Sequence, residues 1–365
     1  MSSGGVCFDA ATGSRCGIVL LNMGMQMRMR SAMDCRRFSM EGHLRMKMLV
    51  TGGAGFIGSH LSQKLLNLGH SVIVVDDLST GTYSNISDLV GTKGFQFVRD
   101  TVRNESIMTT LVDRSDVVFH LAAAVGVQLI VDRPVHTMET NIHGSEVVLN
   151  LANKFRRKIV VASTSEVYGK NTKIPFNEDD DTTLGSTRFT RWSYACSKMV
   201  DEFLALAYHD EFDLPAIICR FFNTIGPRQM GAYGMVVPRF VRRALANDDI
   251  QIYGTGEQSR CFCNVADVVD ALVKLVDCPA AIGEVINVGT TESTTINALA
   301  DKIISKTGSS SQKKYLSYEE AYGRPFDDML VRKPDLTKIR KLIGFEPEFT
   351  LDQTLEQVIQ FEQER

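Results

Sequence analysis

Short apolar runs rich in Val and Ile alternate with longer segments whose leucines recur at helical spacing, over much of this 365-residue chain. Such runs are typical of strands buried on both faces of a sheet. Strand and helix alternate up to Asn223, which predicts an α/β fold with a Rossmann-like, doubly wound parallel sheet. The predicted strands are 47–51, 71–76, 95–98, 117–120, 159–162 and 216–220.

The pattern changes after Gly226, where elements become shorter and loops more frequent. We therefore expect an NAD-binding domain over 47–224 and a smaller, mainly substrate-binding domain over 225–365. Segment 261–289 is expected to return to the main sheet. Residues 1–46 are rich in Met and Arg and show no sustained period, so we expect a disordered extension without an assigned function.

A glycine-rich turn joins the first strand to the first helix, in the stretch Thr51-Gly-Gly-Ala-Gly-Phe-Ile-Gly58. Glycines there let the backbone approach a pyrophosphate at the helix N-terminus, where free N–H groups point outward. The residues of this turn expected to bind the cofactor are Gly52, Gly55, Phe56, Ile57 and Gly58.

The second strand ends at Asp76, whose carboxylate is placed to accept a hydrogen bond from an adenosine ribose hydroxyl. A 2′-phosphate would favour an arginine here, and residues 77–81 contain none. The cofactor predicted is therefore NAD rather than NADP.

Tyr194 and Lys198 are four residues apart, so they share one face of a predicted helix. A neighbouring ammonium stabilises phenolate and would lower the pKa of Tyr194, making it a base near neutral pH. Thr164 follows the strand at 159–162 and can hydrogen-bond the alcohol being oxidised. These three residues predict an alcohol-oxidising site at the carboxyl edge of the sheet.

Composition narrows the class of partner. A net charge of −3 argues against nucleic acid or an anionic membrane surface as a partner. No apolar run approaches the roughly 20 residues that span a bilayer. The eight cysteines show no framework spacing or metal-ligand pattern, which favours reduced thiols and a cytoplasmic location.

The order of these motifs resembles the extended short-chain dehydrogenase/reductase family, in its branch of NAD-dependent nucleotide-sugar epimerases, dehydratases and decarboxylases. Further landmarks are 120–124 and 220–228. The resemblance implies a homodimer built through helix 140–155 and the Tyr194 helix. It also implies cofactor contacts from Asp100, Ala122, Ala123 and Asn141, a sugar-diphosphate contact from Asn223, and base contacts from Val236 and Pro238.

Within that branch, Thr164-Ser165-Glu166 resembles the UDP-glucuronate decarboxylases, and Arg191-Trp192, Arg260-Cys-Phe, Asp328 and 331–334 extend the likeness. The resemblance implies oxidation at C4 of a UDP-sugar, with Tyr194 as base, followed by loss of CO₂. Arg332 would hold the substrate carboxylate, and Ser165 and Arg260 would contact the substrate. Glu166 would assist proton delivery, provided that its pKa is raised.

Other readings remain open. A UDP-sugar 4-epimerase acting on UDP-glucose/galactose or UDP-glucuronate is the main alternative, because segment 124–131 lacks the Pro- and Ser-rich loop of animal and plant decarboxylases. A 4,6-dehydratase is disfavoured by Ser165, where that branch has Asp. A non-catalytic NAD-binding regulator would not need the base Tyr194. Arg260 can equally clamp phosphate, Arg332 can form a surface ion pair, and Glu166 can cap local backbone.

Overall fold

The computed structural model describes residues 45–231, 234–323 and 326–365. The expected disordered extension lies outside the described residues, apart from Arg45 and Met46. Within the described part of the chain, every helix is too short or too polar to span a lipid bilayer.

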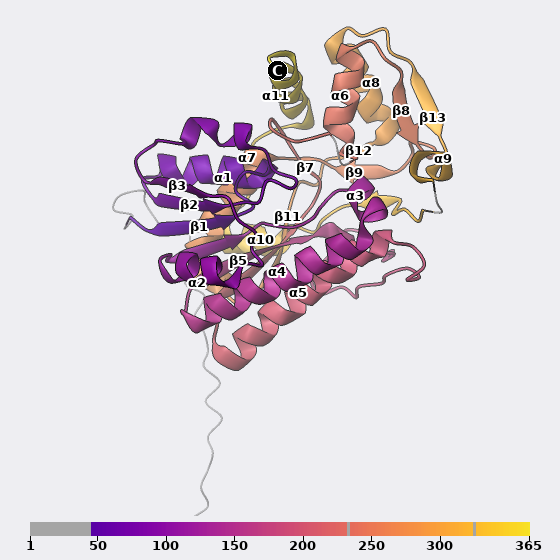
Figure 1. Cartoon of the computed structure of the whole chain (residues 1–365). Coiled ribbons are helices and arrows are strands. Elements are labelled where there is room, and N and C mark those ends of the chain that lie inside the picture. Colours follow the sequence, from indigo (N-terminus) through magenta and orange to yellow (C-terminus); the bar gives the residue numbers. More distant parts are fainter. Residues whose placement is uncertain (1–44, 232–233, 324–325) are drawn as a thin grey trace, which may run out of the picture. The chain divides into compact units, whose positions relative to one another are not determined.

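A parallel sheet organises the described chain (Figure 1), with strand order β11-β6-β5-β4-β1-β2-β3. The order reverses between β4 and β1, as in a doubly wound fold. This sheet confirms the predicted Rossmann-like α/β class. Its strands are β1 (Lys47–Thr51), β2 (Ser71–Val75), β3 (Phe95–Val98), β4 (Val117–His120), β5 (Lys158–Thr164), β6 (Ala216–Phe221) and β11 (Val285–Val288).

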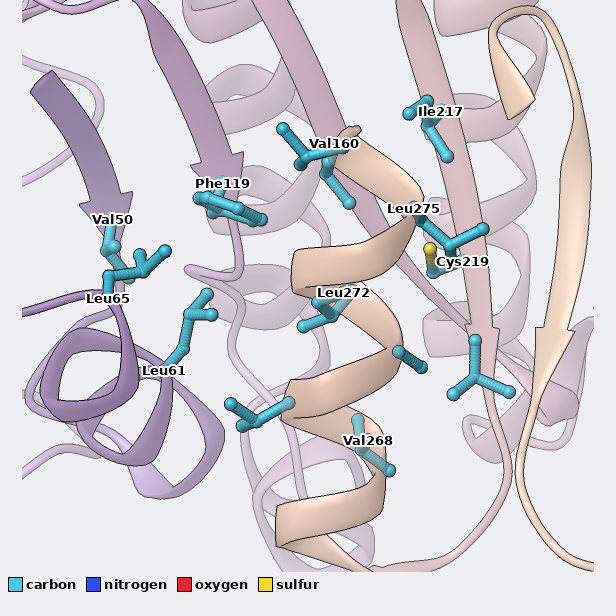
Figure 2. Packing of buried hydrophobic residues seen from close by; sticks show 14 of the residues in the cluster. Val50, Leu61, Leu65, Phe119, Val160, Ile217, Cys219, Val268, Leu272 and Leu275 are labelled. Carbon is cyan, nitrogen blue, oxygen red and sulfur yellow. The ribbon is translucent and has the colours of Figure 1, made fainter. Parts of the chain in front are cut away.

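Helices cover both faces of the sheet because successive strand residues point to opposite sides. Val50 packs with Leu61 and Leu65 on one face, as Figure 2 shows, whereas its neighbour Leu49 belongs to the core of the other face. The first face carries α1 (Phe56–Asn67), α7 (Val265–Val276) and α10 (Thr337–Ile343). The second carries α2 (Glu105–Asp113), α4 (Pro134–Lys154) and α5 (Arg191–Phe212).

A separate apolar cluster forms in the C-terminal part, where Phe240 of α6 and Leu355 of α11 are fully buried. Its helices and paired strands are α6 (Val236–Leu245), α8 (Ile296–Thr307), α11 (Leu351–Gln363), β8 (Ile250–Tyr253) and β13 (Lys313–Leu316). The chain also returns to the main sheet, because β11 pairs with β6 in parallel. The domain boundary between 224 and 225 stays a prediction.

Three short strands form a separate small sheet outside the main one. β9 (Ser259–Cys261) lies between β12 (Ser293–Thr295) and β14 (Val331–Arg332), and β14 is parallel to β9 with Arg332 opposite Arg260. This register brings two arginines distant in sequence to one place. The remaining α-helices and strands are α3 (Val127–Asp132), α9 (Tyr318–Tyr322), β7 (Thr224–Ile225) and β10 (Cys263–Asn264).

Candidate active site

A cavity of about 440 Å³ lies beyond the carboxyl ends of β1, β2, β4, β5 and β6. Parallel sheets bind ligands at this edge because the loops that follow the strands converge there. Every residue that the sequence analysis assigned to the site lines this cavity, except Asn141 and Pro238.

The glycine turn leaves room for a ligand at the start of α1. Gly52 has φ +69°, and a Cβ on it would lie 2.8 Å from the Ala122 Cα. A Cβ on Gly58 would lie 2.3 Å from the Gly52 carbonyl oxygen, so the turn closes only with glycine at this position. Helix α1 has no side-chain cap and no acid in its first turn. Its free N–H groups and positive end therefore suit the pyrophosphate of NAD.

The two carboxylates predicted for the adenosine end also line the cavity. Asp76 Oδ2 accepts a hydrogen bond from Ala54 N at 2.9 Å, and Oδ1 accepts one from Leu78 N at 2.8 Å. Burial raises the pKa of Asp76, while these backbone bonds oppose the rise. Asp100 is held by Thr101 N at 2.8 Å. Both carboxylates keep oxygen lone pairs for ribose or adenine donors.

Asn141 and Pro238 support the cavity from behind. Asn141 is buried, accepts a hydrogen bond from Ala124 N at 2.7 Å and donates one to Ser197 Oγ at 3.1 Å. It thus ties the loop after β4 to α5. Pro238 is buried, and its neighbours Val236 and Val237 in the first turn of α6 line the cavity instead. Contacts from Asn141 to a cofactor and from Pro238 to a base stay predictions, since neither residue lines the cavity.

Tyr194 and Lys198 project from α5 into the cavity, and Tyr194 hydrogen-bonds with Thr164. The expected lowering of the Tyr194 pKa by Lys198 is wrong for the protein's own side chains. Burial raises the pKa of Tyr194, and the carboxylates of Glu166 and Asp201 add to that rise. Lys198 Nζ instead pairs with Asp201 Oδ2 at 2.7 Å. Lowering the pKa of Tyr194 therefore requires further positive charge, which the oxidised nicotinamide ring carries when NAD is bound.

A buried group of charged side chains also lines the cavity. Arg332 Nη1 donates to Glu166 Oε1 at 2.6 Å, and Arg260 Nη2 donates to Asp328 Oδ1 at 3.0 Å. Arg191 bridges the two acids, with 3.1 Å from Nη2 to Glu166 Oε2 and 2.5 Å from Nη1 to Asp328 Oδ1. We call this group the arginine cluster: Glu166, Arg191, Arg260, Asp328 and Arg332.

The cluster fixes the charge of Glu166. Burial alone would raise its pKa, but Arg191 and Arg332 outweigh burial and lower it to about 2. The expectation of a raised pKa is therefore wrong, because sequence could not show that two guanidinium groups face this carboxylate. Glu166 is an anion at neutral pH in these surroundings, which suits an orienting partner of Arg332 rather than a proton donor.

Three residues form ion pairs in the site that the sequence analysis did not predict: Arg191, Asp328 and Asp201. Arg191 lies three residues before Tyr194 on α5, a spacing that places both side chains on one face and could have identified it. Asp201 lies three residues after Lys198 on the same helix. Asp328 has no comparable local signal, since it meets Arg191 and Arg260 only through tertiary contact.

Comparisons with known proteins agree with this geometry. The family model described as GDP-mannose 4,6 dehydratase matches residues 49–358. A UDP-N-acetyl-alpha-D-glucosaminuronate decarboxylase of Bacillus cytotoxicus is 40% identical, over 87% of this chain and 98% of that protein. The UDP-glucuronic acid decarboxylase 1 of Danio rerio is 34% identical, over 87% of this chain and 72% of that protein.

A solved structure shares the fold. The UDP-glucuronic acid 4-epimerase from Bacillus cereus, in complex with UDP-glucuronic acid and NAD, superposes with TM-score 0.79 and 30% identity, covering 87% of this chain and 99% of that chain. The glycine turn, Asp76 and the Tyr194 site thus occur in a fold known to hold NAD. The chain belongs to the GDP-mannose 4,6-dehydratase family of extended short-chain dehydrogenases/reductases, and is an NAD-dependent enzyme acting on nucleotide sugars.

Proposed function

We propose that this enzyme decarboxylates a UDP-linked glucuronate-type sugar. The observation that carries the proposal is the charge of the arginine cluster, which holds three guanidinium groups against two carboxylates. A substrate carboxylate would supply the missing anion. The decarboxylases among the relatives support this assignment.

Arg332 is the residue best placed to receive that carboxylate. Glu166 holds its Nη1, while its buried Nε has no hydrogen-bond partner among the described residues. A guanidinium with one edge fixed and the other unpaired is pre-oriented for a carboxylate. We therefore assign Arg332 to the substrate carboxylate, and Glu166 to keeping Arg332 in place.

The chemistry begins at the sugar C4 hydroxyl. The Tyr194 oxygen takes the proton of the hydroxyl, and Thr164 hydrogen-bonds with Tyr194. Lys198 and Asp201 form an ion pair on the same helix. Bound NAD supplies the hydride acceptor for C4 oxidation. The resulting C4 ketone is β to the carboxylate, so the electrons of the C5–carboxylate bond can move toward the ketone oxygen as CO₂ leaves. Tyr194, now protonated, can hydrogen-bond that oxygen.

A 4-epimerase is the second candidate. The solved UDP-glucuronic acid 4-epimerase shares the fold at 30% identity, and a carboxylate-binding cluster would serve that reaction as well. An epimerase returns the hydride to the opposite face of C4 and keeps the carboxylate. The two reactions therefore differ in whether CO₂ is released, not in how the substrate is bound.

Proton NMR of purified protein with NAD⁺ decides between them. We expect UDP-glucuronate or UDP-N-acetylglucosaminuronate to lose its C5 carboxylate, giving the UDP-pentose or its 4-keto form. Running both sugars tests whether a 2-acetamido group is required, as the name of the Bacillus cytotoxicus relative suggests. Conversion to a C4 epimer with the carboxylate intact would overturn the decarboxylase assignment, and Tyr194→Phe should be inert with either sugar.

We also propose a cytoplasmic homodimer. On α5, Phe203 is 70% exposed and Val200 is 38% exposed, which supports an apolar face available for α4 and α5 of a second copy. Leu204 and Leu206 of the same helix pack against the chain's own core. The described cysteines are free, in keeping with a reducing compartment. Sedimentation velocity measures the dimer, and a monomer at micromolar concentration would contradict it.

A further inference from the structure

Lys198 is paired with a carboxylate that does not line the cavity. Its Nζ donates to Asp201 Oδ2 at 2.7 Å, and the two side chains are 3% and 1% exposed. Lys198 and Tyr194 line the cavity, whereas Asp201 does not. A buried cation is costly unless an anion is close by, so Asp201 neutralises the ammonium from outside the cavity.

A chain of buried hydrogen bonds leads from the glycine turn to Asp201. Ala122 N donates to Thr51 Oγ1 at 3.1 Å, and Thr51 Oγ1 lies 2.9 Å from His120 Nδ1. His120 Nε2 lies 3.0 Å from Ser145 Oγ, and Ser145 in turn hydrogen-bonds with Asp201. Thr51 directly precedes the glycine turn, and Ala122 lines the cavity. The chain therefore connects this turn with Asp201.

The hydrogen bonds of this chain are all directed toward Asp201. Burial lowers the pKa of His120 to about 3, with Lys198 adding to it, so the imidazole is neutral and carries one N–H. A carboxylate only accepts, so the Ser145 hydroxyl donates to Asp201 while its oxygen accepts from His120 Nε2. His120 Nδ1 then accepts from the Thr51 hydroxyl. This arrangement fits an ionised Asp201 held in one orientation.

The charge of Asp201 depends on two neighbours. Burial raises the pKa of Asp201 and Glu202 adds to the rise, whereas Lys198 and Ser145 oppose it. Asp201 Oδ1 has no short hydrogen bond among the described residues, so the ammonium and the hydroxyl carry the stabilisation of this anion. Removing either neighbour should therefore loosen the ion pair.

Several other charged groups lie on α5 or on the elements packed against it, and they are paired elsewhere or exposed. They are Glu202 with Arg220 of β6, Glu166 in the arginine cluster, Asp132 of α3 with Gln128, and the exposed Glu139, His143 and Glu146 of α4. Asp201 is thus the carboxylate that is bonded to Lys198.

We propose that Asp201 is a positioning residue, which is held by Ser145, fixes the ammonium of Lys198 and so sets the charge beside the base Tyr194. The inference rests on the proposed function for the role of Tyr194, which a decarboxylase and a 4-epimerase share. The single charge of Lys198 is matched by Asp201. Without that carboxylate, the phenolate of Tyr194 is the anion that can pair with Lys198, because the two side chains share a helix face. Asp201 therefore governs the pH at which the base forms.

Phenolate absorbance during a pH titration of the NAD-loaded protein tests this role, with the Tyr194→Phe spectrum subtracted to isolate Tyr194. Asp201→Asn should move the midpoint of Tyr194 ionisation to lower pH by about 1–2 pH units, the size expected when one charge near a buried group is removed. The acidic limb of the pH profile of kcat/KM should move the same way. Asp201→Glu keeps the charge and should restore most of the wild-type midpoint.

Asp210→Asn is the matched control, because it removes an exposed carboxylate from the same helix and should leave the midpoint unchanged. Ser145→Ala leaves the charge of Asp201 in place and removes one donor. Its midpoint should therefore move in the same direction as that of Asp201→Asn, by a smaller amount.

An unchanged midpoint in Asp201→Asn, or an equal shift in Asp210→Asn, would overturn the role of Asp201. Thermal unfolding identifies a folding defect of Asp201→Asn. Ser145→Ala then carries the test, and an unchanged midpoint in that variant counts against the proposal. The titration needs no sugar, so an unshifted midpoint with turnover intact refutes this role alone. A shifted midpoint in a protein that converts neither uronate refutes the decarboxylase and keeps the role of Asp201.

Discussion

The two ends of the cavity are built in different ways. The cofactor end is formed by backbone close in sequence, the turn over 51–58 followed by Asp76 at the next strand end. The other end, which we assign to the sugar and call the sugar end, is formed by charged side chains from five separate places, gathered where Arg332 on β14 lies opposite Arg260 on β9. One end depends on a turn that only glycine can form, and the other depends on a balance of charge.

The two ends therefore determine different properties of the enzyme. A glycine turn binds any pyrophosphate through N–H groups, so it fixes the cofactor and says little about the reaction. The arginine cluster has one positive charge in excess, so the substrate's own charge determines how well it fits. We therefore expect reaction specificity to vary with the sugar end while the cofactor end stays the same.

The largest effect should follow Arg332→Ala. Removing the guanidinium that we assign to the substrate carboxylate should slow CO₂ release about 100- to 1000-fold, because the carboxylate is then no longer held in the orientation from which CO₂ leaves. Oxidation of C4, monitored through the absorbance of NADH, should persist in part because Tyr194 and Thr164 are unchanged. Arg340→Ala is the matched control, as Arg340 pairs with Glu346 on the surface. Equal loss of both steps, or loss of neither, would refute this division.

A smaller effect is expected from Gly58→Ala at the cofactor end. The new Cβ would lie 2.3 Å from the Gly52 carbonyl oxygen, so the turn must shift. The Kd of NAD should rise about tenfold or more, and stability should fall by about 1–3 kcal/mol. Isothermal titration with NAD and with UDP measures this, with Asn67→Ala on the exposed end of α1 as control. A matching loss of UDP affinity would show that the two ends are not independent.

The sugar end should also show a pH dependence of stability. Because the pKa of Glu166 is lowered from 4.5 to about 2, its ionised form stabilises the fold above pH 4.5, and this is lost as pH falls toward 2. The contribution is on the order of 3 kcal/mol. Glu166→Gln should thus be less stable than wild type at neutral pH, with the difference narrowing in acid, as chemical denaturation would measure.

Asp76→Asn provides the contrast at the cofactor end. Burial raises the pKa of Asp76, so ionisation of this group does not favour the folded state as that of Glu166 does. Its difference from wild type should therefore not narrow between pH 4.5 and 2. Parallel behaviour of the two variants would mean that the arginines do not set the charge state of Glu166.

The sequence by itself determined the sheet, the NAD turn and the Tyr194 helix. Each depends on a local rule: apolar runs make buried strands, glycines permit a tight turn, and a four-residue spacing aligns Tyr194 with Lys198. Such rules act over a few residues and are therefore readable along the chain. Arg332 was also singled out from its motif, but its ion pair with Glu166 was not predicted.

Only the tertiary structure decided how the charges combine. The pairing of Glu166 with Arg332 joins residues far apart in sequence, and the ion pair of Lys198 with Asp201 is buried. These contacts reversed the expected pKa shifts of Glu166 and Tyr194, because electrostatic effects depend on distance and burial rather than on residue order. The unpaired Nε of Arg332 became visible for the same reason, since only packing shows which buried donors lack a partner among the described residues.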